Sequence, residues 1–422
     1  MNPCGAGYQP AAALRAACVV GAERACWKQA AGSIARPTRA LLILTLALTS
    51  PGFAQTYADN ITLDHPAIHY SSGPFDNAVT RLQAQLDSGK ANLDFAGVTG
   101  YLPSLLQHLG VNVDSQALVF SKTSFQSQKI SPRNPRAIYF ADDVAVGYVR
   151  GGDVLELAAT DPRQGIVFYT LAAAKAEKPC LKRREDCLRC HQGPATIGVP
   201  GIFVGSVYPG LSGLPDRSGA IITDHRTAFA DRWGGWYVNA LRGEQPDRAN
   251  SVAPDPEEPQ KLELLPALFK TFNSAAYLSP VSDIVALMTF EHQTQMTNLL
   301  IRLAWQARVG IVQQQQIDEL AAYMLFAKEA PLTEPIEGAS TFSETFPKRG
   351  PLDGQGRSLR DFELKTRLFR YPLSYMIYSP SFDALPEPIR ARIYQQISAH
   401  SSRAAIEILC DTKPGLPSHF CH

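Results

Sequence analysis

Cys187-Leu188-Arg189-Cys190-His191 is the stretch around which the rest of the chain can be interpreted. It places two thiols three positions apart and an imidazole directly after the second thiol. On one helical turn both thiols can reach the two vinyl groups of a single porphyrin, and His191 then lies under the ring with a nitrogen for the iron. The C-x-x-C-H pattern therefore predicts that Cys187, Cys190 and His191 bind one covalently attached haem c.

Two other uses of paired cysteines compete with this interpretation. The chain has 8 Cys and 9 His in 422 residues, so about 0.003 such motifs are expected by chance. A thioredoxin-like redox pair should open a helix after a strand, whereas a charged run, 182–186, precedes this motif and a loop, 192–194, follows it. A zinc site needs a second ligand pair of similar spacing, and the sequence has no second C-x-x-C. These surroundings favour haem.

A short apolar run near the start of the chain indicates export, which this kind of haem attachment requires in bacteria. Arg36 and Arg39 form a basic region, residues 40–48 are apolar, and small residues lead to a cleavage site predicted after Ala54. The residues before Arg36 are unusual for a signal peptide, so translation starts downstream or a long leader is discarded. We expect 1–54 to be a signal region and the protein to be periplasmic or secreted. The apolar run is shorter than the roughly 20 residues of a bilayer span, so no membrane span is expected in the mature chain.

The charge of the processed chain argues against a polyanionic partner. From 40 basic and 39 acidic residues, removal of 1–54 takes away five basic residues and one acidic residue, which leaves 35 and 38 and a net charge of −3. No strong field favours nucleic acid. Cys410 and Cys421 flank a Pro/Gly-rich turn, and in an oxidising compartment we expect them to form a disulfide.

The mature segment, 55–422, has the pattern of an α+β protein. Residues 115–172 contain short runs of Val, Ile, Phe and Tyr between turn residues, which predict an antiparallel β-meander of four or five strands. The haem motif lies in a loop-rich middle, 180–255, and 256–422 is mostly helical. We expect a single large haem-binding domain. The predicted helices cover residues 75–86, 102–109, 281–308, 313–328, 357–369 and 388–409.

The strongest helical pattern, 281–308, has a histidine inside its apolar stripe. His292 is four residues from both Met288 and Met296, so the three side chains point the same way. A buried histidine needs partners for its ring nitrogens, and an iron is one such partner. A carbonyl or carboxylate in the core is the ordinary alternative. We expect His292 to be the second iron ligand beside His191, with Met296, His225 or an open position as alternatives.

Two tryptophans lie in the loop-rich middle, in Arg232-Trp233-Gly234-Gly235-Trp236-Tyr237. In one interpretation Trp233 and Trp236 pack on the haem ring and an arginine pairs with a haem propionate. In the other, the segment is a tight aromatic turn in the core.

The motif and the export signal resemble those of c-type cytochromes, although no methionine follows soon afterwards in a proline-flanked loop. Three longer strings, 131–150, 224–236 and 356–365, are similar to large single-haem bacterial proteins described as cytochrome c domain-containing. The resemblance covers most of the mature chain. It implies one domain around one haem and brings no known substrate.

Three functions fit these features. The first is a periplasmic electron carrier, whose partner is a redox protein or a component of a quinol or oxidase chain. The second is a peroxidase-like haem oxidoreductase with an open distal site, in which Asp224, His225 and Arg226 would assist O–O cleavage. The third is a module that binds or senses a small gas.

Overall fold

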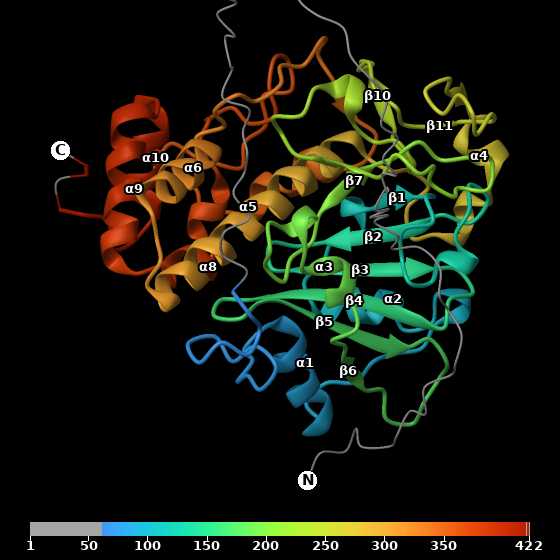
Figure 1. The fold of residues 1–422 in the computed structure, drawn as a ribbon, viewed down its shortest axis with the longest axis horizontal. Coiled ribbons are helices and arrows are strands. Elements are labelled where there is room, and N and C mark those ends of the chain that lie inside the picture. Colours follow the sequence, from blue (N-terminus) through green and yellow to red (C-terminus); the bar gives the residue numbers. More distant parts are fainter. Residues whose placement is uncertain (1–60, 419, 422) are drawn as a thin grey trace, which may run out of the picture. The chain divides into compact units, whose positions relative to one another are not determined.

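Six consecutive strands fold back on one another: five lie within 115–172, as predicted, and a sixth at 181–183 extends the meander. The computed structural model describes residues 61–418, 420 and 421, so the predicted signal region lies outside the described residues. Strands β1 to β6 pair antiparallel in chain order, and β9 (Trp236–Tyr237) joins at β1 to complete a seven-stranded sheet, β6-β5-β4-β3-β2-β1-β9 (Figure 1). The strands are β1 (Ala117–Val119), β2 (Arg136–Phe140), β3 (Val144–Val149), β4 (Val154–Asp161), β5 (Gly165–Ala172) and β6 (Leu181–Arg183).

One face of this sheet is covered by two helices from the start of the described chain. Along β4 the side chains alternate, with Leu155, Leu157 and Ala159 buried and their neighbours only half-buried. The buried set packs in one apolar cluster with residues of α1 (Ala78–Asp87) and α2 (Leu102–His108).

The other face is shared by a long helix and by the loop-rich middle. Helix α5 (Ile284–Val309) begins at Asp283, whose carboxylate accepts hydrogen bonds from two backbone N–H groups of the first turn, and it ends at Gly310 with a φ of 80°. It packs with Val119, Ile138 and Phe140 of the sheet in the second apolar cluster. Most of its side chains are buried, because sheet, loops and helices surround it.

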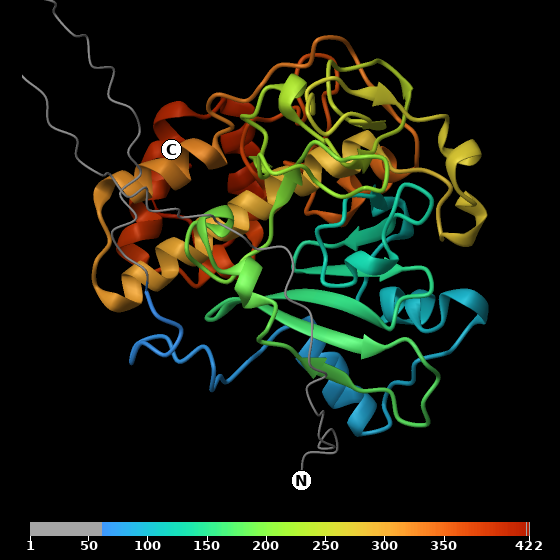
Figure 2. The ribbon, with the colours of Figure 1, turned by 45° about the vertical axis from the view of Figure 1, so that its right-hand side comes forward.

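The second half of the chain is helical, as predicted. Helix α6 (Gln314–Met324) packs against α5 and α9 (Glu387–His400) packs against α6, and α10 (Arg403–Thr412) follows α9 in the same helical group (Figure 2). Shorter helices are α4 (Leu268–Thr271), α7 (Phe342–Thr345) and α8 (Pro380–Asp383). The architecture is α+β, with the antiparallel sheet first and the helices after it. Among the described residues no helix has both the length and the apolarity to cross a membrane.

Two helix predictions were wrong in detail. Residues 357–369 are irregular, because the carboxylate of Asp353 accepts from the N–H of Arg357 (2.8 Å) and that of Glu363 accepts from three following N–H groups. Such local side-chain bonds compete with the helix. The predicted helix 388–409 is two helices, because the hydroxyl of Ser402 accepts from the N–H of Ala405 (3.2 Å) and starts a second one.

The loop-rich middle contains little regular structure. It holds the single turn α3 (Leu188–His191) and the pairs β7 (Val204–Ser206) with β8 (Ile221–Thr223) and β11 (Ser251–Val252) with β12 (Glu263–Leu264). Strand β10 (Ala240–Arg242) pairs with β13 (Glu337–Gly338) and so ties this segment to the helical half. Figure 1 shows α3 over the same side of the sheet as β7.

The predicted disulfide between Cys410 and Cys421 is present, with 11 residues of sequence separation. It ties the end of α10 to the last residues of the chain, where the ring of Phe420 packs 5.5 Å from that of Tyr394. Phe420 is buried in the same apolar cluster as α5.

We expect removal of this disulfide to destabilise the helical half. In the chain-entropy model a loop of this length contributes about 3 kcal/mol to the free energy of unfolding. Urea unfolding of the double variant Cys410→Ser/Cys421→Ser should show a loss of that size. Each single variant should lose the same amount, because either one breaks the bond. A double variant within about 0.5 kcal/mol of the wild type would contradict the prediction.

Candidate haem-attachment site

The five residues of the motif form one compact turn. The backbone N–H groups of Cys190 and His191 both donate to the carbonyl of Cys187, at 3.2 and 3.1 Å. Leu188 is the buried anchor of the turn, while Cys187 is half-buried and Cys190 is exposed. Burial raises the pKa of the Cys187 thiol to about 11. The two cysteines are three positions apart on this turn and therefore lie on one side of it.

The imidazole of His191 is fixed through one of its two nitrogens. Its Nδ1 lies 3.0 Å from the carbonyl oxygen of Gly201, and its own carbonyl accepts from the N–H of Gly201 at 2.9 Å. A carbonyl can only accept, so Nδ1 carries the proton and Nε2 keeps its lone pair. Burial lowers the pKa of His191 to about 4. At neutral pH the ring is therefore uncharged, and its Nε2 makes no hydrogen bond to any described residue, which is the form that binds a metal.

Two aromatic rings and one asparagine position this histidine. The ring centroids of Phe168 in β5 and of Phe203 lie 4.8 and 5.6 Å from that of His191. Asn298 of α5 holds the loop that contains Gly201 and Phe203. Its side-chain amide donates to the carbonyl of Ile202 (2.9 Å) and accepts from the N–H of the same residue (3.3 Å). A Cβ on Gly201 would lie 2.2 Å from the Asn298 side chain, so only glycine fits there.

A charged pair on the sheet faces the motif. Strand pairing places Arg136, Gly147 and Glu156 on the same sheet face as Phe168, and a Cβ on Gly147 would lie 2.7 Å from the Arg136 guanidinium. Arg136 and Glu156 form an ion pair at 2.5 Å. After burial and the Gly201 hydrogen bond, these two charges have the largest influence on the pKa of His191: Arg136 lowers it and Glu156 raises it.

The two tryptophans of the loop-rich middle lie in the core. Trp233 and Trp236 are buried in the apolar cluster of α5, and Trp236 donates its indole N–H to the carbonyl of Gly205 at 2.8 Å. Trp233 has a φ of 67° and packs edge-on against Phe229. In the described part of the chain, the aromatic rings that pack against His191 are those of Phe168 and Phe203.

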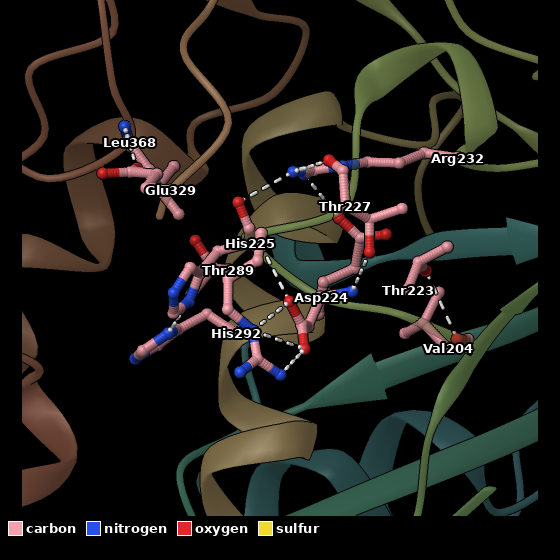
Figure 3. Close-up of polar contacts among 12 residues, drawn as sticks. Val204, Thr223, Asp224, His225, Thr227, Arg232, Thr289, His292, Glu329 and Leu368 are labelled. Carbon is pink, nitrogen blue, oxygen red and sulfur yellow. Dashed lines mark hydrogen bonds and ion pairs between the residues drawn. The ribbon is translucent and has the colours of Figure 1, made fainter. Parts of the chain in front are cut away.

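His292 lies in a second polar centre, together with His225 (Figure 3). The two Nδ1 atoms are 2.9 Å apart, and Nε2 of His292 is 2.7 Å from the hydroxyl of Ser374. Tyr323 and Phe326 stack on the His292 ring. Both histidines are buried, and burial lowers the pKa of each well below its ordinary value. Both are therefore neutral.

The structure does not bring His292 next to His191. The recorded ring neighbours of the two histidines are different, and both ring nitrogens of His292 already have protein partners. Met296 is fully buried in the apolar cluster of α5. Nε2 of His225 is buried and has no hydrogen-bond partner among the described residues.

Two ion pairs lie beside the histidine pair, one with an exposed arginine and one fully buried, and sequence reasoning missed the buried one. Arg226 is bound to Asp224, with a shortest contact of 2.6 Å. Arg232 donates to the carboxylate of Glu291 (3.0 Å) and to the carbonyl of His225 (3.0 Å). Burial raises the pKa of Glu291 to about 7, although Arg232 opposes the shift. A glutamate inside an apolar helix was the available signal, because a buried charge needs a partner.

Comparisons with known proteins do not assign this site. No family model, no curated protein and no solved structure matches the chain.

The neutral histidine pair predicts a pH dependence of stability. Because the folded pKa values lie below those of the unfolded chain, their contribution is complete above pH 6.5 and is lost as the pH falls, by about 1.4 kcal/mol per pH unit for each histidine. His225→Asn, which can still bond to His292, should therefore make the fall in unfolding free energy between pH 6.5 and 5 shallower in urea titrations.

His400→Asn, at the exposed end of α9, controls for the substitution itself and should keep the wild-type slope. The pKa of Glu291 is raised on folding, so its contribution to the unfolding free energy grows as the pH falls. Glu291 is present in all three proteins, so this contribution does not affect the comparison. Equal slopes in the wild type and His225→Asn would contradict the prediction.

Proposed function

We propose that this chain is a c-type cytochrome that carries one haem on Cys187 and Cys190 and transfers electrons in the periplasm. The observation that carries the proposal is the state of His191, which is neutral, protonated on Nδ1 by virtue of the Gly201 carbonyl, and bare on Nε2. Metal-binding histidines generally donate their other N–H in this way, which fixes both ring orientation and tautomer. The two cysteines on the same turn supply the attachment points.

The residues around the motif suit a one-electron cofactor. A bound haem c would supply an iron that cycles between ferric and ferrous states. His191 would be the proximal ligand, Phe168 and Phe203 exclude water from one side of its ring, and the Arg136–Glu156 pair sets the local potential. The predicted partner remains a redox protein or a component of a quinol or oxidase chain.

The candidate second ligand, His292, is already hydrogen-bonded within the protein. For His292 to bind the iron, it would have to give up Ser374 or His225. The peroxidase-like alternative needs Asp224, His225 and Arg226 around an open site, and all three are engaged in internal contacts. We therefore favour the carrier over the enzyme.

Haem attachment is tested by expressing the full chain with a bacterial c-type maturation system. We expect a covalent mass increase of one haem and the absorption spectrum of haem c. Cys187→Ser/Cys190→Ser should lose both, because the thioether bonds cannot form, while Cys410→Ser/Cys421→Ser, the matched cysteine control, should keep both. A wild-type protein without covalent haem would overturn the proposal.

The same preparations test the second ligand. A six-coordinate low-spin ferric iron that becomes high-spin in His292→Ala, and not in His225→Ala, would identify His292. A five-coordinate high-spin wild type that binds cyanide readily would favour the enzyme instead.

The charged pair predicts opposite shifts of reduction potential. A negative charge near the haem stabilises the ferric form and a positive charge destabilises it. Arg136→Gln should therefore lower the midpoint potential, and Glu156→Gln should raise it, each by about tens of millivolts. Redox titration of the double variant, which removes both charges, should return a value near that of the wild type. Single variants that shift in the same direction would show that these residues act through structure rather than charge.

A further inference from the structure

A cavity of about 530 Å³ lies away from the haem motif, where turns of the sheet meet the helical half. Its wall includes Asp143 after β2, Arg81 of α1, Arg349, and the segment that begins at Tyr375. No residue of the Cys187–His191 turn lines it. A space of this volume is of the size that proteins use for small organic ligands.

One wall of the cavity is rigid and electrically neutral. The guanidinium of Arg360 is paired with both carboxylate oxygens of Asp142 and lies over the rings of Phe346 and Tyr375, at 4.7 and 4.3 Å from their centroids. The hydroxyl of Tyr375 donates to Gln293 of α5 at 2.8 Å. This wall can therefore make van der Waals contacts with a ligand but presents no uncompensated charge to it.

Among the remaining charges of the described residues, Arg349 has no ion pair and Asp143 has only a long one. Arg81 is paired with Asp76 at 2.7 Å, and its contact with Asp143 is long, at 3.9 Å. The carboxylate of Asp143 has no closer ion pair within the described part of the chain, and Arg349 has none there at all. Burial and Asp142 raise the pKa of Asp143, while Arg81 and, to a smaller extent, Arg349 lower it. The two groups therefore share one cavity without neutralising each other directly.

We propose that this cavity binds a small zwitterion of the α-amino acid class, with its carboxylate on Arg349 and its ammonium group on Asp143. A simple anion would satisfy Arg349 and leave its negative charge facing Asp143. A simple cation would satisfy Asp143 and leave its positive charge facing the arginines of the cavity. A ligand with both charges satisfies both groups through charge-assisted hydrogen bonds. The aromatic and apolar wall, which includes Met376 and Leu109, is available to its side chain.

The test is calorimetric titration of the purified, matured protein with the standard α-amino acids, one at a time. We expect at least one to bind. For that amino acid, the deamino acid and the decarboxylated amine should each bind about tenfold more weakly or not at all, because each leaves one charge in the cavity unpaired. If no amino acid binds, or if the deamino acid or the amine binds as tightly as the parent, the zwitterion assignment is wrong.

Variants locate the binding to this cavity. Arg349→Gln and Asp143→Asn should each weaken binding about tenfold, while Arg370→Gln and Asp64→Asn, which change exposed residues outside the cavity, should bind as the wild type does. Wild-type affinity in both Arg349→Gln and Asp143→Asn would overturn the proposal. The measurement is independent of the haem, because it reads heat of binding and not the redox state.

Discussion

The hydrogen bond between Nδ1 of His191 and the carbonyl of Gly201 is the constraint on which the chemistry of the motif depends. It decides which nitrogen carries the proton and therefore which one faces outward. The carbonyl is in turn fixed by Asn298, whose amide bonds to both backbone groups of Ile202. Helix α5 thus positions a ring that lies about a hundred residues earlier in the sequence. A four-residue turn such as α3 has too few hydrogen bonds to hold an imidazole by itself.

The same helix carries the second polar centre, and there burial sets the protonation state. Burial of an arginine is tolerated only if its N–H groups make hydrogen bonds. Arg232 donates to the carboxylate of Glu291 and to the carbonyls of His225 and Thr227. That arrangement keeps positive charge beside His225, which, with burial, disfavours an imidazolium. A single proton therefore lies between the two Nδ1 atoms of the histidine pair, and neither ring is an imidazolium. Its hydrogen bonds are satisfied without an iron, apart from Nε2 of His225.

The sequence contained enough to predict the sheet, the long helix and the disulfide, because each rests on a local pattern. Alternation along 115–172, the apolar stripe of 281–308 and two cysteines around a turn are all short-range signals. The wrong helix at 357–369 fails for the opposite reason, since its pattern is helical but Glu363 binds the backbone locally. The contacts of His292 were beyond reach, because His225 and Ser374 lie 67 and 82 residues away from it in the chain. Periodicity shows that a residue is buried and does not show what it is buried against.

Most residues around the candidate site lie far from the Cys187–His191 motif in the sequence, and this accounts for the size of the chain. The motif contributes the thiols and the imidazole, but its aromatic walls come from β5 and from the loop before β7, and the charged pair that acts on the pKa of His191 comes from β2 and β4. Face pairing in the antiparallel sheet brings Arg136, Glu156 and Phe168 to one side, and α5 packs on the same side through Ile138 and Phe140. A minimal helical cytochrome has no such sheet. Here the sheet gives the ion pair a rigid base, so the charges that act on His191 are fixed by strand register and not by flexible surface side chains.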